Sequence, residues 1–134
     1  MTGFPLKIVT PEGLIFDGQA EKLIVRTTSG DTAILARHIN YVTPLGMGQA
    51  VVVADGNRRL GACIGGMLSM VNGECTLLPT TFEWAESIDV ERAEASRLKA
   101  EKILADSNST EADLQLAKAR LCRALIRKNV ASFK

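Results

Sequence analysis

Glycine and proline occur in only one part of this 134-residue chain. All eleven glycines and all four prolines precede residue 85, and the sequence beyond it is rich in Ala, Leu, Glu, Lys and Arg. Glycine and proline interrupt helices, whereas those five residue types are strong helix formers. One uniform architecture is therefore excluded, and we predict two parts, residues 1–85 and residues 86–134.

Residues 1–85 have the pattern of a β domain. Thr10-Pro11-Glu12-Gly13, Asp55-Gly56-Asn57 and Asn72-Gly73 are turn sequences, and Asn-Gly supplies the positive φ angles of a type I′ hairpin turn. Short apolar runs lie between the turns, at residues 6–9, 14–16, 22–27, 50–53, 60–64, 67–71 and 75–78. Many short strands at regular spacing predict an antiparallel sandwich or barrel rather than a parallel sheet.

Residues 86–134 have the pattern of a helical hairpin. Asp89 is a good N-cap for a first helix that we expect to end near Asp106. Thr110 followed by Asp113 resembles a capping box that opens a second helix running to about Lys128. Two helices of this length are not stable alone, so they must pack on each other, on the β domain or on a partner. The hairpin is therefore a candidate two-state element.

Helical periodicity predicts the contact faces of the hairpin. On the first helix the expected face consists of Asp89, Ala93, Ser96, Ala100 and Ile103. On the second helix an apolar stripe is expected at Leu114, Ala117, Leu121, Ala124 and Leu125. The opposite side of the second helix carries the basic residues Arg120, Arg123 and Arg127.

Charge and cysteine content exclude several classes of protein. Sixteen Lys and Arg nearly balance fifteen Asp and Glu, which gives no support for a nucleic-acid partner. The spacing of Cys63, Cys75 and Cys122 fits neither a zinc site nor a disulfide framework. We expect free thiols in a reducing compartment and no bound metal.

The residues needed for catalysis are not recognisable in this sequence. The single histidine, His38, has no nearby cysteine or carboxylate that would complete a triad. Gly65-Gly66 is followed by Met67 and Leu68, which predicts a close backbone approach or a bulge rather than a phosphate loop. We therefore expect no enzymatic activity. No signal peptide or membrane span is expected either, so membrane association would come through a partner.

Four segments, in the same order, resemble the epsilon subunits of bacterial ATP synthases. Ile88-Asp89-Val90-Glu91-Arg92-Ala93 matches the family signature Ile-Asp-x-x-Arg-Ala. Residues 7–13, 30–38 and 65–68 are similar to the opening strand and turn, to the segment Gly-Glu-x-Gly-Ile-Leu-Pro-Gly-His, and to Ser-Gly-Gly-Phe-Leu. Ala36-Arg37 and Ile39-Asn40-Tyr41 depart from the usual Pro-Gly and Ala-Pro-Leu of the loop that lies on the rotor side in this family.

The resemblance implies an α+β protein with an N-terminal antiparallel sandwich of about ten strands and a C-terminal two-helix antiparallel hairpin. It implies a central-stalk subunit at the cytoplasmic face of the cell membrane, with the sandwich against the gamma subunit and the c-ring and with Asp31 and His38 at that interface. It also implies that the hairpin can extend toward the alpha and beta subunits and restrain ATP hydrolysis. Arg120, Arg123 and Arg127 would then meet an acidic surface of the beta subunits.

In some members of this family the folded hairpin binds ATP as a regulatory ligand, although no cofactor is required. Carried over by position, Glu83 and Ala93 would lie near the base, and Ile88 and Asp89 beside the nucleoside. Arg92, Arg123 and Arg127 would face the phosphates, with Lys99 in a place where the family often has Arg. The alternative is that these basic residues only complement a helix dipole.

Two other functions are compatible with the same residues. One is a stand-alone ATP sensor, which would bind ATP but ignore a gamma subunit. The other is an adaptor that holds acidic proteins or RNA on its basic helix, with a steep dependence on salt. The balanced charge and the absence of interleaved aromatic residues disfavour RNA.

Overall fold

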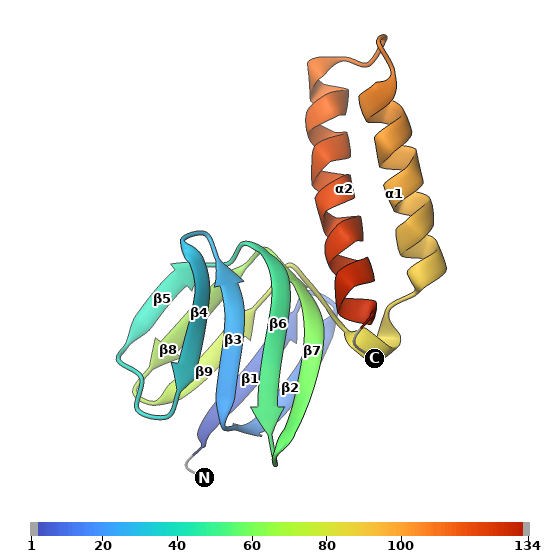
Figure 1. Cartoon of the computed structure of the whole chain (residues 1–134). Helices are drawn as coiled ribbons and strands as arrows, with labels where there is room; N and C mark the ends of the chain where they lie inside the picture. Colours follow the sequence, from blue (N-terminus) through green and yellow to red (C-terminus); the bar gives the residue numbers. More distant parts are fainter. Residues whose placement is uncertain (1–2, 133–134) are drawn as a thin grey trace. The chain divides into compact units, whose positions relative to one another are not determined.

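The computed structural model describes residues 3–132 and divides the chain into two compact units, Met1–Trp84 and Ala85–Lys134. Within the described residues the first unit holds ten strands in two five-stranded sheets, and the second holds one short 3-10 turn and two α-helices (Figure 1). The prediction of a β sandwich followed by a helical hairpin is confirmed.

The two sheets are built from strands that alternate along the chain. The first sheet has the order β2 (Gly13–Ala20), β1 (Phe4–Thr10), β9 (Glu74–Leu78), β8 (Met67–Val71), β5 (Tyr41–Pro44). The second sheet has the order β10 (Thr81–Trp84), β7 (Asn57–Ile64), β6 (Met47–Ala54), β3 (Lys22–Thr27), β4 (Gly30–Leu35). Strands β4, β5 and β10 were not recognised in the sequence, because each is short and only partly apolar.

One pairing differs from the expected antiparallel pattern. Strands β1 and β9 run parallel, with Leu6 beside Cys75 and Ile8 beside Leu77. A parallel pair needs a long crossover rather than a tight turn, and here the connection passes through strands of both sheets, from β2 to β8. Local turn chemistry predicts hairpins but carries no signal for such a pairing, so the sequence did not reveal it.

The turns follow the predicted chemistry. Asp55 and Gly56 have φ angles of 52° and 74°, and Asn72 and Gly73 have 50° and 82°, as a type I′ turn requires at both central positions. Gly66 has a φ of 102° and lies against the backbone of the next hairpin strand. A Cβ atom at this position would collide with the Leu78 carbonyl oxygen, so the predicted close approach is confirmed.

The sandwich core consists of the inward residues of both sheets. Phe4, Leu6 and Ile8 alternate with exposed or half-buried neighbours along β1, which is the period of a strand with one buried face. Trp84 packs at the edge of this core, with its ring centroid 5.0 Å from that of Phe82. The expectation of free thiols is met at Cys63, Cys75 and Cys122, and burial raises the pKa of Cys63 and of Cys75 to about 12.

Both helices begin at the predicted caps. Helix α1 (Val90–Ala105) starts after Asp89, whose carboxylate accepts a hydrogen bond from the Arg92 backbone N–H at 3.1 Å. Helix α2 (Glu111–Ala131) starts at a reciprocal capping box between Thr110 and Asp113. The second helix ends at Ala131 rather than at Lys128, because Lys128, Asn129 and Val130 continue helical hydrogen bonding and no glycine stops them.

The contact faces of the helices match the predicted ones in part. Ala93 and Ala100 are buried on α1, but Ser96 is exposed. Ala117, Ala124 and Ala131 are buried on α2, but Leu125 is 48% exposed. The observed seam between the helices has the alternating spacing of three and four residues that is found in coiled coils. The apolar residues alone did not predict this seam, because two of its positions carry charged residues.

We expect Gly66→Ala to destabilise the sandwich much more than Gly73→Ala. Both residues have positive φ, so Gly73→Ala should cost about 1 kcal/mol. The new methyl group at position 66 would also approach within 2.6 Å of Pro79 Cα, whereas nothing lies within 4 Å of the corresponding position at 73. A loss of about 3 kcal/mol or more is expected for Gly66→Ala in urea unfolding. Equal losses would contradict the close approach.

Candidate functional site

The outer face of the first sheet carries an exposed row of apolar residues that crosses all five strands. In register from one edge to the other, the row is Leu14, Val9, Leu78, Met67 and Pro44. Leu14, Leu78 and Met67 are 59%, 46% and 41% exposed, so these side chains do not belong to the core. We call this set the apolar row.

A shallow cavity of about 360 Å³ lies on the apolar row. It is lined by Val9, Thr10, Pro11, Leu78, Pro79 and Thr80. It lies between the turn after β1 and the end of β9. A cavity of this kind can receive one apolar side chain of a protein partner.

Exposed apolar residues also occur in and beside the loop between β4 and β5. Ile39 of the loop is 77% exposed, and Leu35 of β4 and Val42 of β5 are 52% and 59% exposed. Arg37 has a φ of 67°, a conformation that favours glycine, which is the residue usual for the resembled family at this place. This loop is where the sequence departs from the family pattern, and its exposed apolar side chains were not recognised from the sequence.

Asp31 and His38 are the two residues predicted at the rotor-side interface. Asp31 is the second residue of β4, and His38 lies in the loop that follows β4. Asp31 pairs with Arg26 across the strands, with 3.4 Å between Arg26 Nη1 and Asp31 Oδ1, and both side chains are largely exposed. The His38 ring lies against Tyr41, with 5.7 Å between ring centroids, and its Nδ1 is 2.8 Å from the Ile39 carbonyl oxygen. The structure therefore does not bring Asp31 and His38 into one cluster.

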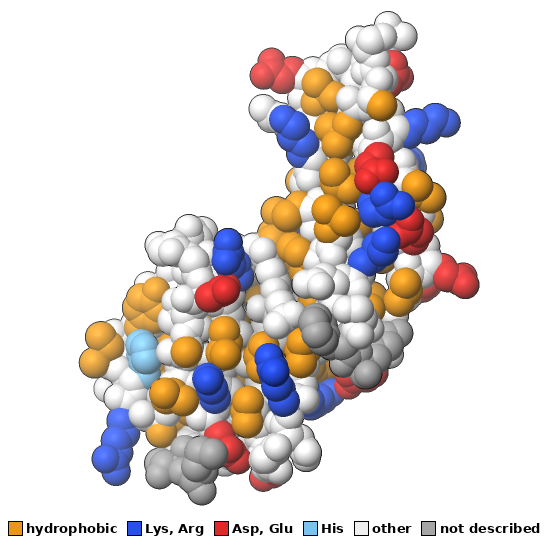
Figure 2. Space-filling view, in the orientation of Figure 1, with side chains coloured by type: hydrophobic (Ala, Val, Ile, Leu, Met, Phe, Trp, Pro, Cys, Tyr) orange, Lys and Arg blue, Asp and Glu red, His pale blue; other side chains and the backbone are white. Residues whose placement is uncertain are grey.

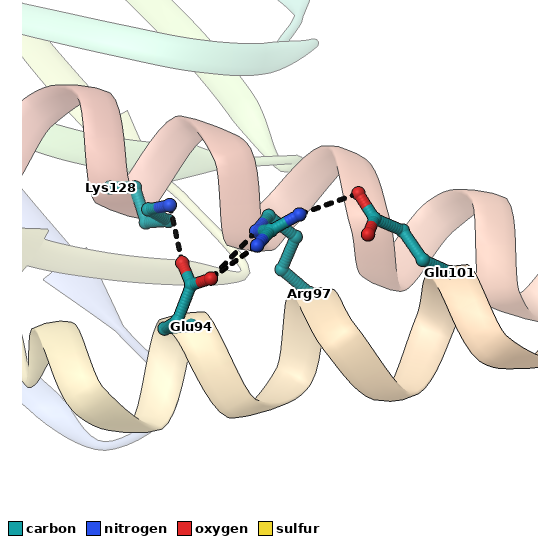
Figure 3. A network of polar contacts seen from close by, with 4 residues as sticks. All are labelled: Glu94, Arg97, Glu101 and Lys128. Carbon is teal, nitrogen blue, oxygen red and sulfur yellow. Dashed lines mark hydrogen bonds and ion pairs between the residues drawn. The ribbon is translucent and has the colours of Figure 1, made fainter.

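One side of the helical hairpin holds a network of four charged residues (Figure 3). Arg97 donates to Glu94 on one side and to Glu101 on the other, with 2.7 Å between Arg97 Nη1 and Glu101 Oε1. The Lys128 ammonium from α2 contacts the other oxygen of Glu94. Glu94 therefore links the two helices. Hydrogen bonds from Arg97 and then from Lys128 lower the pKa of Glu94 to about 2.

The opposite side of the hairpin is basic. Residues 92 and 99 are one heptad apart on α1, and residues 123 and 127 are one turn apart on α2. In an antiparallel helix pair, equivalent flanks of the two seams lie on the same side, so Arg92, Lys99, Arg123 and Arg127 share the side opposite Glu94. Four cations from two helices on one side can bind a polyanion such as a phosphate chain.

The remaining predicted nucleotide residues are less accessible. The side chains of Ile88 and Ala93 are 3% and 4% exposed, so they present little surface to a ligand in this conformation. Asp89 serves as the N-cap of α1. Glu83 lies on β10 of the sandwich, a different unit from the helices. Arg120, on α2, is exposed and lies on the basic side of the hairpin.

Among residues 3–132, no group of three or more His, Cys, Asp or Glu is arranged to hold a metal ion. Within the same described range, neither helix is long and apolar enough to cross a membrane. On the face of the molecule seen in Figure 2, Lys and Arg stand singly among apolar and acidic side chains. That face offers no concentrated basic patch for a nucleic acid.

Two functional features were missed in the sequence. The spacing of Glu94, Arg97 and Glu101 indicates ion pairs on one helix, but their connection to Lys128 depends on how the helices align. The apolar row joins residues that are up to 69 positions apart, from Val9 to Leu78, and only the strand order brings them together. Neither feature has a local sequence signal.

The fold defines a two-unit protein in which a ten-stranded β sandwich is followed by an α-helical hairpin. The family description for the beta-sandwich domain of the ATP synthase delta/epsilon chain matches residues 3–85, and that for its long alpha-helix domain matches residues 86–132. The chain belongs to the ATP synthase delta/epsilon chain family.

Curated relatives support the same assignment. The chain is 40% identical to the ATP synthase epsilon chain of Ruminococcus albus over 136 residues, covering 100% of both proteins. It is 40% identical to that of Bacillus velezensis over 126 residues, covering 94% of this chain and 95% of the relative. The resemblance to epsilon subunits is thus confirmed.

Solved structures share the fold. A chain in the cryo-EM structure of the Euglena gracilis mitochondrial ATP synthase, which includes F1 and the c-ring, superposes with a TM-score of 0.82 at 18% identity. The superposition covers 100% of this chain and 83% of that one. At this identity the likeness establishes the fold alone.

We expect an NMR titration of the Glu94 carboxyl group to have its midpoint near pH 2. Because the pKa is lower in the folded state, the ion pairs stabilise the hairpin above about pH 4.5, and this contribution is lost as the pH falls toward 2. Arg97→Met should raise the midpoint more than Lys128→Met, since Arg97 makes the larger contribution. A wild-type midpoint near the ordinary value of 4.5 would contradict the network.

Proposed function

We propose that this chain is a non-catalytic central-stalk subunit of an F-type ATP synthase, peripheral at the cytoplasmic face of the cell membrane. Its sandwich binds the gamma subunit and the c-ring, so that ion-driven rotation of the ring is coupled to ATP synthesis in the catalytic head of alpha and beta subunits. Membership of the epsilon family supports this proposal. The observation that carries it is the exposed apolar row on the first sheet.

The apolar row has the properties of a protein interface. Single exposed apolar residues are ordinary, but a contiguous row that crosses a whole sheet is an interaction site in a soluble protein. The row lies on rigid strands and includes a cavity for an anchoring side chain. Along β5 it continues from Pro44 to Val42 and the exposed loop, where Ile39 and His38 extend the surface. We assign the row to the gamma subunit and the loop to the c-ring.

We expect Leu78→Glu to weaken binding of the chain to the purified gamma subunit by at least about tenfold, because the interface would desolvate an unpaired carboxylate. Leu78 is 46% exposed, so the fold should tolerate the change. Asn57→Glu, at the exposed turn between β6 and β7, is the matched control and should bind normally. Titration monitored by native mass spectrometry measures both. Unchanged binding of Leu78→Glu would show that this face of the sheet does not contact the gamma subunit.

We further propose that the hairpin is the regulatory part of the protein. In the closed form its basic side binds ATP through Arg92, Lys99, Arg123 and Arg127. When it opens, Arg120, Arg123 and Arg127 contact an acidic surface of the catalytic head and restrain ATP hydrolysis. The gathering of these cations on one side supports a polyanionic ligand. An arginine guanidinium can donate two parallel hydrogen bonds to one phosphate, whereas the Lys99 ammonium supplies only a point charge.

We expect calorimetric titration to detect ATP binding that is weakened about 100-fold or more in Arg92→Ala/Arg123→Ala. Each arginine–phosphate contact contributes about 1.5–3 kcal/mol. The control, Lys102→Ala/Lys118→Ala, removes the same charge from positions outside the basic side and should bind ATP as the wild type does. Each variant is titrated both with and without Mg²⁺. Equal weakening in both double variants would indicate a general charge effect and contradict the site.

A further inference from the structure

The seam between α1 and α2 contains two charged residues. On α1 the seam positions follow the coiled-coil spacing through Ala93, Arg97, Ala100 and Leu104. On α2 the corresponding positions are Leu114, Ala117, Leu121, Ala124, Lys128 and Ala131. Arg97 and Lys128 therefore occupy places that an apolar residue would normally fill. Their side chains are only 23% and 34% exposed.

The rest of the seam is made of alanine and leucine. Counting in opposite directions along the two helices from the Glu94–Lys128 contact, Ala100 lies near Leu121, and Leu104 lies near Ala117. Each layer thus combines one small and one large side chain. The same count places Arg97 near Ala124 and Lys128 near Ala93. In these two layers, which contain the start of α1 and the end of α2, the large side chain is therefore a cation.

Glu94 contacts both cations of these two layers, and Glu101 pairs with Arg97 as well. Glu94 accepts hydrogen bonds from Arg97, with 3.1 Å between Arg97 Nε and Glu94 Oε1, and it contacts the Lys128 ammonium through Oε2. The Oε2 atom itself is inaccessible to solvent. Glu94 is therefore the carboxylate through which the charged layers of the two helices are joined.

We propose that Glu94, Arg97 and Lys128 form an ionic lock that joins the two helices of the closed hairpin while keeping the closed state less stable than an alanine–leucine seam would. This inference rests on the proposed function in one respect, namely that opening of the hairpin is a working motion. The lock makes opening sensitive to ionic strength without any nucleotide, because salt screens a partly exposed ion pair but does not weaken an apolar layer.

Two sets of variants move hairpin opening in opposite directions. Glu94→Gln removes the described counter-charge of Lys128 and one of the two carboxylates paired with Arg97, and it should favour opening. Arg97→Leu/Lys128→Leu completes the alternating alanine–leucine layers and should favour closure, as when buried ion pairs are replaced by packed apolar residues. Glu101→Gln is the matched control, because Glu101 is paired with Arg97 on the same helix and makes no described contact with α2.

Amide hydrogen exchange on the full chain measures opening directly, since exchange in a helix follows its local opening equilibrium. Exchange in α1 and α2 should be about fivefold to tenfold faster in Glu94→Gln and at least about fivefold slower in Arg97→Leu/Lys128→Leu. Raising NaCl from about 0.05 M to 0.5 M should accelerate it in the wild type but not in the apolar variant. Glu101→Gln should stay within about twofold of the wild type.

The proposal is overturned if exchange in Glu94→Gln stays within about twofold of the wild type, or if the apolar variant exchanges faster. Amides of the sandwich serve as the internal reference, and acceleration there equal to that in the helices would also overturn it. The measurement uses neither ATP nor the gamma subunit. Loss of binding in the tests of the proposed function would therefore leave the ionic lock standing, and failure of the lock would leave the stalk assignment standing.

Discussion

The hairpin depends on one constraint, which is that its two helices meet mainly through alanine. An alanine methyl group buries little apolar area, and burial stabilises by only about 0.8 kcal/mol per CH₂-sized group. Ala93, Ala100, Ala117 and Ala124 permit a close approach of the helix axes but provide little free energy. Neighbouring side chains must therefore supply other contacts between the helices. The Glu94 network joins the two helices beside these alanines.

The sandwich has the opposite energetic character. Its core contains large side chains that are fully buried, among them Phe4, Leu23, Ile34 and Met70. It needs nothing from the helices to exclude water from that core. The helices, in contrast, bury mainly alanine where they meet. The two units of the protein therefore differ in the size of the side chains that they bury.

The helices themselves were predictable to within three residues, because caps act locally. Asp89 and the Thr110–Asp113 box satisfy backbone N–H groups of their own first turns, so sequence alone identifies them. The faces of the helices were less predictable. Ser96 and Leu125 were expected in the seam but are exposed. The seam positions include the charged residues Arg97 and Lys128, which a search for apolar periodicity does not detect. The shared side of the candidate basic residues of the two helices follows only from the antiparallel alignment.

By itself the sequence determined the two-part architecture, the type I′ turns at Asn72-Gly73 and Asp55-Gly56, the caps of both helices and the resemblance to a family. Each of these depends on residues within a few positions of one another, where backbone sterics and local hydrogen bonds decide. Only the tertiary structure decided the parallel pairing of β1 with β9, the apolar row from Leu14 to Pro44 and the link from Glu94 to Lys128. These features join distant segments, and their energies depend on packing that no local pattern encodes.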